Sequence, residues 1–407
     1  MKNVDVLVIG AGAAGMAAAL AAAEQGAKVL LVEREDRTGG ILNQCIHNGF
    51  GLHYFKKELT GPEYAEIFRE KLEGSGIDTY VEKFVLEVDV KKREVIVVSK
   101  EGIEKIHPRS LILATGARER PFGSLLIPGD RPSGIYTAGV VQRLINIENR
   151  LPGKRALILG SGDIGLIMAR RLILEGMEVV GVVERLPYPG GLLRNVIQCL
   201  EDFNIPLFLS STVVEVKGKE RLEEVVVASV DEKYNPIPGT ERTFKVDTLV
   251  LSVGLIPQVE LVSDFVEIDR SSKGFAVSNT GQTTVSWIFA AGNSTVIYDL
   301  VDYVTYEGEI AGRSAVRYID GKDVGKTKVS VEAGENIGIL FPKWFDPLED
   351  LTMYIRVRKP IEKGILIVEG ALERKVEDLV PSEMIRIKIP KSRINASEKL
   401  KVFIKEE

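Results

Sequence analysis

Apolar residues recur along the chain with spacings that predict both buried strands and helices. Near the start, the mainly apolar run Val4–Ile9 predicts a parallel strand that is covered on both faces. A glycine-rich turn follows, and the alanine-rich segment Met16–Glu24 then predicts a helix. The same succession returns with a strand at Arg155–Leu159 and a helix at Ile164–Glu175. The pattern thus predicts two βαβ beginnings, which are typical of α/β proteins.

Further apolar runs extend this picture towards the C-terminus. Before residue 320 they predict strands at 28–32 and 178–183, a helix at 61–72, a hairpin at 84–99, strands at 110–114, 245–252 and 287–291, and a helix at 300–316. From about residue 326 the runs become short and alternating, and Pro, Gly, Asp and Ser separate them. This last pattern predicts a small all-β, sandwich-like domain.

Both predicted strand-to-helix junctions carry the Gly-x-Gly-x-x-Gly pattern of dinucleotide-binding turns, at Gly10–Gly15 and Gly160–Gly165. The first glycine permits the turn, the second lets a pyrophosphate approach, and the third lets helix and strand pack closely. The strands that follow end in Glu33 and Glu184, whose carboxylates should accept hydrogen bonds from ribose hydroxyls. A glycine-rich turn without a nucleotide is the alternative for either copy. Two copies in full context favour two dinucleotides, a flavin and a nicotinamide.

The order of these features predicts that one nucleotide-binding domain is inserted into the other. Residues 1–117 and 246–325 are expected to form the first domain, residues 118–245 the inserted domain, and residues 326–407 the C-terminal β domain. The expected fold class is α/β, with two Rossmann-like FAD/NAD(P)-binding domains and a small C-terminal all-β domain. The β domain is expected either to dock another subunit or to pack on its own chain.

Asp299 directly precedes the last predicted helix, and Asp302 follows three residues later. Asp299 is therefore expected to be the N-cap of this helix. The positive end of the helix could stabilise negative charge near N1 and O2 of a reduced flavin. An ordinary capped surface helix is the alternative.

Composition and charge exclude several other classes of protein. The formal net charge of −5 leaves no basic surplus for binding nucleic acid. No apolar run is long enough to span a bilayer and no signal peptide precedes Val4, so we expect a cytoplasmic protein. Cys45 and Cys199 are the two cysteines and cannot form a disulfide framework. With only three histidines as well, no protein metal site is expected.

Taken together, the motifs resemble those of the pyridine nucleotide–disulfide oxidoreductases, which are flavoproteins with two dinucleotide sites. The matching features are, in chain order, Gly10–Gly15 with Glu33, Ala114–Gly116, Gly160–Gly165 with Glu184, and Phe289–Asn293. The resemblance covers residues 1–325. It implies FAD on the first domain, NAD(H) on the inserted domain, and hydride transfer between nicotinamide C4 and flavin N5.

Two sets of cofactor-binding residues follow from this resemblance. The FAD set is Gly10, Gly12, Ala14, Gly15, Glu33, Arg34, Gly39, Gly40, Ala114, Thr115, Gly116, Gly292 and Asn293. The NAD set is Gly160, Gly162, Asp163, Ile164, Gly165, Glu184 and Gly254. Glu184 should repel the 2′-phosphate of NADP(H) and so favour NAD(H), whereas the neighbouring Arg185 could contact that phosphate.

Two departures from the family pattern change the expected chemistry. Asn293 stands where the family usually has an Asp that contacts the ribityl or phosphate region of the flavin. The amide can still form hydrogen bonds there, but it carries no charge. The paired redox cysteines of the disulfide reductases are also absent, because the chain has no Cys-x-x-Cys or Cys-x4-Cys. Dithiol exchange by the usual route is therefore ruled out.

The stretch Gly39–His53, together with the C-terminal β domain, is similar to a subgroup found beside anaerobic glycerol-3-phosphate dehydrogenase subunits. More distantly, it resembles subunits of opine oxidases and hydrogen cyanide synthase. This resemblance implies an electron-transferring subunit that links the flavin of a partner dehydrogenase to NAD. A homo-oligomer is a further expectation.

The same stretch holds the candidate catalytic residues Cys45 and His47. Cys45 follows the Gly39–Gly40 turn, so its thiol could lie near the flavin and form a sulfenic acid or a mixed disulfide. A small buried apolar residue is the alternative. His47 and His53 could supply protons to reduced flavin or to a substrate, or they could serve in structural hydrogen bonds.

The preferred hypothesis is an FAD-dependent NAD(H) oxidoreductase that exchanges electrons with a partner flavoprotein, because no residue set for a distinct organic substrate is visible. One alternative is a stand-alone single-cysteine NADH oxidase or thiol-disulfide reductase that uses Cys45. Another is a non-enzymatic, flavin-binding scaffold subunit.

Overall fold

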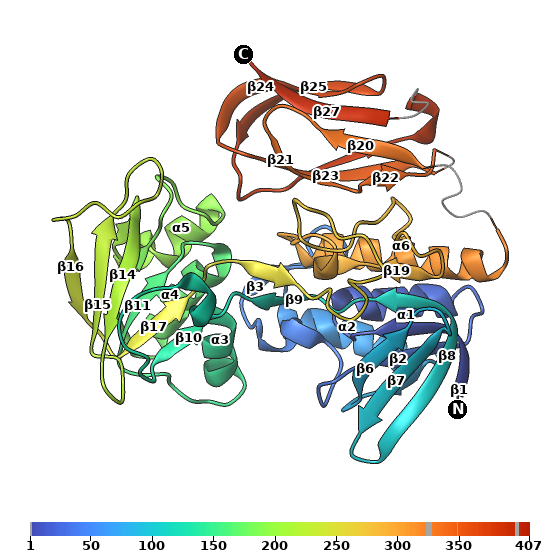
Figure 1. Cartoon of the computed structure of the whole chain (residues 1–407), viewed down its shortest axis with the longest axis horizontal. Helices are drawn as coiled ribbons and strands as arrows, with labels where there is room; N and C mark the ends of the chain where they lie inside the picture. Colours follow the sequence, from blue (N-terminus) through green and yellow to red (C-terminus); the bar gives the residue numbers. More distant parts are fainter. Residues whose placement is uncertain (1, 323–327, 348, 395–398) are drawn as a thin grey trace. The chain divides into compact units, whose positions relative to one another are not determined.

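The structure is a computed structural model that describes residues 2–322, 328–347, 349–394 and 399–407 (Figure 1). It divides into two units, Met1–Arg118 with Ile256–Glu407, and Glu119–Leu255. The chain crosses between the units at β9 (Ala117–Glu119) and β18 (Leu255–Pro257). The division into three domains stays a prediction, and its boundary between residues 325 and 326 lies outside the described residues.

A mixed sheet lies at the centre of the first unit. Its strands are, in order, β5 (Asp78–Tyr80), β2 (Val29–Val32), β1 (Lys2–Ile9), β8 (Gly102–Leu113), β7 (Glu94–Ser99) and β6 (Phe84–Asp89), and β19 (Ile288–Ala290) pairs with β8. The strands β5, β2, β1, β8 and β19 are parallel, whereas β6, β7 and β8 form an antiparallel meander. Val6 and Val8 enter one hydrophobic cluster while Leu7 and Ile9 enter another. The sheet is therefore covered on both faces, as the apolar run predicted.

The helices α1 (Ala13–Ala23) and α6 (Val301–Ile319) pack closely together. A Cβ on Gly308 would lie 2.3 Å from the carbonyl oxygen of Ala14, and one on Gly312 would lie 2.3 Å from that of Ala18. Small residues thus let the two backbones touch. The contacts advance in the same direction along both helices, so the helices run parallel. Since Ala14 meets Gly308, the residues Val301–Glu307 extend α6 by about 10 Å beyond the start of α1.

The long connection between β2 and β5 shares the hydrophobic core of α1 and the sheet. It holds the short 3-10 helix η1 (Gly40–Gln44), β3 (Asn48–Phe50), β4 (Leu59–Thr60) and the helix α2 (Gly61–Glu73). The predicted start of α2 is confirmed, because Thr60 and Glu63 form a reciprocal capping box and Pro62 stands in the first turn.

The start of α6 differs from the prediction. The helix begins at Val301 with Leu300 as its N-cap, and no side chain caps it. Asp299 instead forms an ion pair with Arg356 and accepts a 2.5 Å hydrogen bond from the backbone N–H of Met384. Both partners belong to the C-terminal part of the chain and hold the carboxylate away from the helix end. The predicted N-cap at Asp299 is therefore wrong.

Two sheets form a β-sandwich in the C-terminal part of the first unit, which confirms the predicted all-β fold there. One sheet consists of β22 (Trp344–Phe345), β20 (Val329–Ala333), β27 (Lys399–Glu406), β24 (Ile361–Val368) and β25 (Leu372–Leu379). The other consists of β21 (Ile337–Phe341), β23 (Leu351–Val357) and β26 (Ile385–Ile389), and η5 (Lys391–Arg393) follows it. Leu366 and Val402 from the first sheet share a buried cluster with Ile355 and Ile387 from the second.

This sandwich packs on its own chain. Phe341, Tyr354 and Met384 share a buried cluster with Tyr298, which lies just before α6. The ring centroids of Tyr298 and Tyr354 are 5.0 Å apart in an edge-on arrangement. With the Asp299–Arg356 ion pair, these contacts join the sandwich to the segment that leads into α6. Of the two expected roles, packing on its own chain is the one that these contacts show.

Glu307 of α6 is buried, and burial raises the pKa of its carboxyl to about 7. Because the pKa in the folded state is above the ordinary value of 4.5, ionisation opposes folding, and stability falls as the pH rises from about 4.5 through about 7. We expect Glu307→Gln to stabilise the protein at pH 8 by up to about 3 kcal/mol, from about 1.4 kcal/mol for each tenfold change in the protonation equilibrium.

At pH 5 the effect of Glu307→Gln should be small. Thermal unfolding at the two pH values measures it, with the exposed Glu362→Gln as a matched control. A Glu307→Gln variant that is less stable than the parent at pH 8 would contradict this account.

The second unit repeats the parallel core of the first. Its sheet has the order β10 (Ile135–Thr137), β17 (Thr248–Leu251), β11 (Arg155–Leu159), β12 (Glu178–Val183) and β13 (Leu207–Phe208), and all its pairs are parallel. Its helices are α3 (Ala138–Asn146), α4 (Asp163–Leu174) and α5 (Leu193–Cys199), with η2 (Phe122–Leu125) and η3 (Glu201–Phe203). An antiparallel sheet of β14 (Ser211–Lys217), β15 (Glu224–Ser229) and β16 (Arg242–Lys245), which the sequence analysis did not predict, completes the unit.

Candidate dinucleotide sites

The first glycine-rich turn lies at the carboxyl end of β1, beside the end of β8. Gly10 has a φ of +95°, and a Cβ there would lie 2.4 Å from the carbonyl oxygen of Ala114. A Cβ on Gly15 would lie 1.7 Å from the carbonyl oxygen of Gly10. Both positions therefore require glycine. At Gly12, in contrast, nothing comes within 4 Å of the Cβ position, which leaves open space where a pyrophosphate could approach.

Glu33 follows β2 and is buried against this turn. One carboxylate oxygen accepts a hydrogen bond of 2.8 Å from the backbone N–H of Ala11, and the other accepts one of 3.0 Å from that of Glu35. These bonds fix the carboxylate, whose remaining lone pairs could accept ribose hydroxyls. The side chain of Arg34 is 55% exposed and lies 3.7 Å from Glu35, so it is available to a ligand at the surface.

The turn at Gly39 and Gly40 lies directly beside the open space at Gly12. The backbone N–H of Gly39 donates a 2.7 Å hydrogen bond to the carbonyl oxygen of Ala11. A Cβ on Gly40 would lie 3.1 Å from the Cα of Gly12. The structure thus brings the Gly39–Gly40 pair to one side of the first turn.

The segments that follow β8 and β19 reach the same end of the sheet. Ala114 donates a backbone hydrogen bond of 2.9 Å to Ile9, and the Thr115 hydroxyl donates one of 2.6 Å to Gln258. Gly116 has a φ of +69° and open space at its Cβ position. Gly292, in the 3-10 helix η4 (Gly292–Ser294), packs on Ala14: a Cβ added to Gly292 would lie 2.9 Å from the Cβ of Ala14.

Asn293 follows Gly292 and holds the loop that leads towards α6. Its side-chain oxygen accepts a 3.1 Å hydrogen bond from the backbone N–H of Tyr298. The amide oxygen therefore has a structural partner, and its amide N–H₂ could donate to a ligand.

The connection from Gly40 to Leu59 reaches the first turn of α6. The backbone N–H of His53 donates a 3.2 Å hydrogen bond to Oδ2 of Asp302, and the hydroxyl of Tyr306 donates one of 2.9 Å to the carbonyl oxygen of His53. Burial raises the pKa of the Asp302 carboxyl, while the backbone N–H groups of His53 and Tyr54 act in the opposite direction. This carboxylate was not among the predicted cofactor-binding residues.

Cys45 and His47 lie within this connection. Cys45 is half-buried after η1, and its carbonyl oxygen accepts a 2.8 Å hydrogen bond from Gly61. Nδ1 of His47 lies 3.1 Å from the carbonyl oxygen of Asn48, and its ring centroid lies 5.0 Å from that of Phe50. These contacts are local. A redox or acid–base role for either side chain stays a prediction.

The second turn, in the other unit, has the same construction. Gly160 has a φ of +100°, and a Cβ there would lie 2.0 Å from the carbonyl oxygen of Ser252. A Cβ on Gly165 would lie 2.5 Å from that of Gly160. At Gly162 the nearest atom to a Cβ would be the hydroxyl of Ser252, 3.7 Å away, and Gly254 has open space at its Cβ position. The approach to the start of α4 is therefore open as well.

Glu184 is held by a residue that the sequence analysis missed. Its Oε2 accepts hydrogen bonds of 2.9 Å from the backbone N–H of Ser161 and 2.6 Å from the Ser161 hydroxyl. That hydroxyl also accepts a 2.8 Å hydrogen bond from the N–H of Gly190. Ser161 stands at the variable position inside the motif, where the glycine pattern alone gives no signal.

Asp163 and Arg185 are both engaged within the second unit. Oδ1 of Asp163 accepts hydrogen bonds from the N–H of Leu192 (2.8 Å) and from the amide of Asn195 (2.6 Å). Asp163 therefore fixes the loop before α5, while Ile164 follows it in α4. The guanidinium of Arg185 lies 4.8 Å from the ring centroid of Tyr234. This stacking engages only the face of the guanidinium, so its N–H groups could still meet a 2′-phosphate.

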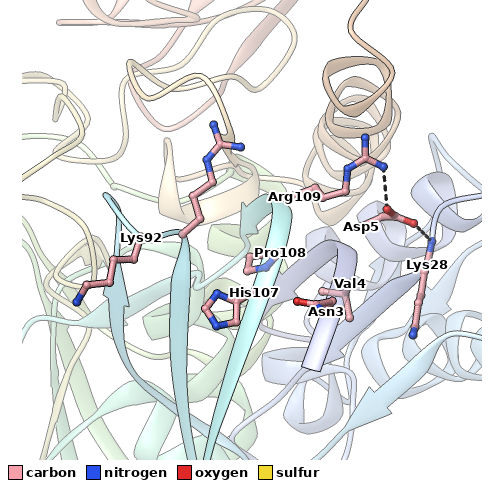
Figure 2. A pocket seen from close by; sticks show the side chains of 9 residues that line it. Asn3, Val4, Asp5, Lys28, Lys92, His107, Pro108 and Arg109 are labelled. Atoms are coloured by element: carbon pink, nitrogen blue, oxygen red, sulfur yellow. Dashed lines mark hydrogen bonds and ion pairs between the residues drawn. The ribbon is translucent and has the colours of Figure 1, made fainter. Parts of the chain in front are cut away.

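One pocket of the first unit does not belong to its glycine-rich turn. A pocket of about 390 Å³ lies at the amino-terminal end of β1, near Asn3, Asp5 and Arg109 (Figure 2). Arg109 pairs with Asp5 at 3.0 Å, and Asp5 also accepts from the backbone N–H of Lys28 at 2.9 Å. Sheets of this kind bind ligands at their carboxyl ends, so this pocket is not a candidate cofactor site. Among the described residues, no group of three or more His, Cys, Asp or Glu could hold a metal.

Comparison with known proteins decides the family. The model of the family described as pyridine nucleotide-disulphide oxidoreductase matches residues 4–308. The chain belongs to this family. The predicted activity class, an FAD-dependent pyridine nucleotide oxidoreductase, and the predicted cofactors, FAD and a nicotinamide dinucleotide, are thereby confirmed.

Curated relatives resemble the chain over part of their length. An opine oxidase subunit of Agrobacterium tumefaciens (strain Ach5) is 25% identical over 334 residues, which cover 76% of this chain and 64% of that protein. The hydrogen cyanide synthase subunit HcnB of Pseudomonas protegens is 28% identical over 285 residues (64% and 58%). NADH oxidase of Methanocaldococcus jannaschii is 29% identical over 269 residues (63% and 55%). The chain thus spans about three fifths of the length of these relatives.

Solved structures confirm the fold. Thioredoxin reductase of Lactococcus lactis is similar with a TM-score of 0.64 and 23% identity, over 78% of this chain and 99% of that one. Thioredoxin reductase of T. acidophilum gives a TM-score of 0.65 and 22% identity, over 79% and 99%. In the part of the chain that the structure describes, no helix has the length and apolar character needed to cross a membrane.

Proposed function

We propose that the chain is an electron-transferring subunit that passes hydride and electrons between NAD(H) and FAD and exchanges them with a second flavoprotein. One observation carries this proposal: the chain combines two glycine-rich turns of the dinucleotide-binding type with the lack of a cysteine pair. Cys45 belongs to the first unit and Cys199 is buried in the second, so neither unit contains a dithiol. Electrons that enter from a nicotinamide then leave to an acceptor outside the chain, and we infer that this acceptor is a second flavoprotein.

In this proposal the first turn holds FAD. A Cβ at Gly10 or Gly15 would collide with a backbone carbonyl oxygen, whereas the Cβ position at Gly12 is empty. This arrangement fits a bound pyrophosphate. The other proposed contacts come from the residues around that space: Ala14, Glu33, Arg34, Gly39, Gly40, Ala114, Thr115, Gly116, Gly292 and Asn293. FAD, when bound, supplies the hydride chemistry, and the chain binds and orients it.

The second turn holds NAD(H) in this proposal. The same pattern recurs here: a Cβ at Gly160 or Gly165 would collide with a backbone carbonyl oxygen, whereas one at Gly162 would not. Ser161 holds Glu184 at the place where a ribose hydroxyl is expected. Asp163, Ile164 and Gly254 line the same turn. The fixed Glu184 carboxylate supports a preference for NAD(H) over NADP(H), because it would repel a 2′-phosphate.

A glycerol-3-phosphate dehydrogenase-like flavoprotein is the partner that we infer. Two observations support it: the similarity of Gly39–His53 and the C-terminal sandwich to the subgroup found beside such dehydrogenases, and the relatives that are named as subunits. The test is to mix the purified holo-chain with a purified glycerol-3-phosphate dehydrogenase flavoprotein from the same source. Glycerol-3-phosphate-dependent reduction of NAD⁺ should require both proteins. A chain that oxidises NADH at full rate alone, with no gain from the dehydrogenase, would refute the partner role.

Cys45→Ser separates electron relay from thiol chemistry. Under the relay proposal, the variant should keep at least about half of the NADH-dependent dye reduction, because no bond to sulfur forms in that route. A single-cysteine oxidase or disulfide reductase should instead lose its NADH-dependent activity by about 100-fold or more, as is usual when a nucleophile is removed.

Anaerobic bleaching of the flavin by NADH, followed by stopped flow, tests the scaffold alternative, since a scaffold need not be reduced rapidly.

A further inference from the structure

The helix α3 carries apolar side chains on two faces. One face belongs to the hydrophobic cluster that also contains residues of α4 and of the parallel sheet, and its members are Ala138, Val141 and Ile145. Val140, Leu144 and Ile147 follow one another at spacings of four and three residues, which places them together on another side of the helix. Val140 is 46% exposed and Ile147 is 39% exposed, while Leu144 is half-buried. The second unit thus uses one apolar face of α3 for its core and leaves the other to solvent.

Leu151 extends this row beyond the end of the helix. The backbone N–H of Arg150 donates a 2.8 Å hydrogen bond to the carbonyl oxygen of Leu144, so the chain turns back beside the last turn of α3. Leu151 follows and is 52% exposed. We call Val140, Leu144, Ile147 and Leu151 the α3 stripe. Single exposed apolar side chains are common on protein surfaces, whereas a group of neighbouring ones marks an interaction surface.

A bound dinucleotide does not cover the far end of the α3 stripe. Ile147 and Leu151 stand before β11 begins at Arg155, at the amino end of the parallel sheet. The second glycine-rich turn follows the carboxyl end of β11, where sheets of this kind bind their ligands. The cofactor site therefore leaves this part of the stripe to a macromolecule.

A charged pair borders the α3 stripe. Nε of Arg143 lies 3.4 Å from Oε1 of Glu148, and the two side chains are 53% and 37% exposed. The backbone N–H of Glu148 also donates to the carbonyl oxygen of Arg143, so the two residues lie one turn apart on the same flank. This pair has the same midpoint along the sequence as Leu144 and Ile147 (143 + 148 = 144 + 147). A two-fold axis through that midpoint brings Arg143 of one copy opposite Glu148 of a second copy, and Leu144 opposite Ile147.

We propose that the α3 stripe joins two copies of this chain, with their α3 helices antiparallel across a two-fold axis. Each copy offers the apolar stripe and both members of the charged pair, so the surface is complementary to itself. The stripe spans about 10 Å from Val140 to Ile147, because a helix rises about 1.5 Å per residue. This contact is smaller than a standard interface, so we expect a dissociation constant on the order of 10 µM. The inference does not rest on the electron-transfer partner proposed above.

Ile147→Lys tests the apolar part of this contact. Sedimentation velocity of the holo-chain, from about 1 to about 200 µM, measures the dissociation constant of the dimer. The variant should raise that constant by about 10- to 100-fold, because each copy loses a buried apolar side chain and gains a charge. NADH-dependent dye reduction should stay unchanged. Ile237→Lys is the matched control, since Ile237 is also 39% exposed but lies between β15 and β16, and it should leave the constant unchanged.

Exchange of the two charges tests the two-fold arrangement. Arg143→Glu or Glu148→Arg alone places like charges opposite each other twice, so each variant should weaken its own dimer by about 10-fold. In an equimolar mixture of the two variants, opposite charges meet again across the axis. The mixture should therefore associate at lower concentration than either variant alone, which is a result that only a contact between positions 143 and 148 of two copies gives.

Three results would overturn the proposal. The first is a holo-chain that stays monomeric at the highest concentration. The second is a dimer that Ile147→Lys leaves unchanged, or charge variants that gain nothing from being mixed. The third is a monomeric holo-chain whose Ile147→Lys variant binds the purified glycerol-3-phosphate dehydrogenase flavoprotein more weakly, because the α3 stripe would then dock that partner in place of a second copy.

Discussion

Replacing Gly12 by valine is expected to give a folded protein that no longer retains FAD. The backbone at Gly12 has φ −75° and ψ −170°, which any residue adopts, and nothing lies within 4 Å of its Cβ position. The new side chain therefore costs the fold little, but it fills the space that a pyrophosphate needs. Loss of two charge-assisted hydrogen bonds alone would weaken FAD binding by at least about 100-fold. Flavin absorbance of the purified variant and titration of the apo-protein measure this.

Gly15→Ala provides the contrast to Gly12→Val. A Cβ there would lie 1.7 Å from the carbonyl oxygen of Gly10, so the start of α1 cannot keep its place on the turn. This variant should lose thermal stability even without FAD, whereas Gly12→Val should unfold within a few degrees of the parent apo-protein. If Gly12→Val retains FAD with parental affinity, the pyrophosphate does not lie at the first turn.

The corresponding change in the second unit should separate the two cofactors. Gly162→Val is expected to leave the protein yellow with bound FAD but to slow its anaerobic reduction by NADH by about 100-fold or more, for the same physical reason. The nearest atom to the new Cβ is the Ser252 hydroxyl at an ordinary 3.7 Å, so the fold should survive. Stopped-flow bleaching of the flavin at varied NADH is the measurement.

Each of these two valine variants serves as the control for the other. Dithionite should still reduce the flavin of Gly162→Val at the parental rate, because that reductant needs no nicotinamide site. Parental bleaching of Gly162→Val by NADH would mean that the second turn does not hold the nicotinamide cofactor.

Local patterns were sufficient where short-range physics decides the structure. The two turns combine a buried strand, glycines with positive φ and a carboxylate at the end of the next strand, and each part has its own sequence signal. The start of α2 is equally local, since Thr60, Pro62 and Glu63 form its cap among themselves. Such elements are encoded within a few residues, and the sequence predicted them correctly.

Long-range contacts explain what the sequence did not predict. Asp299 has the residue type and position of an N-cap, but Arg356, 57 residues away, competes for its carboxylate. The partner of Glu184, Ser161, lies 23 residues before it, at a position that the motif leaves open.

The strand β25 lacked a sequence signal for a different reason. It carries mostly charged side chains at the edge of its sheet, so it has no apolar alternation to detect.

The contact between α1 and α6 also sets an order for folding. Ala14 and Gly308 are 294 positions apart (308 − 14), so the alanine-rich helix leaves the ribosome long before its partner has been made. Residues 119–255, in contrast, are one continuous stretch that contains every strand of its own parallel sheet. Domains generally fold as units during synthesis. Residues 119–255 can thus complete their sheet first, whereas the sheet of residues 1–118 lacks β19, and α1 lacks its partner α6, until both have been synthesised.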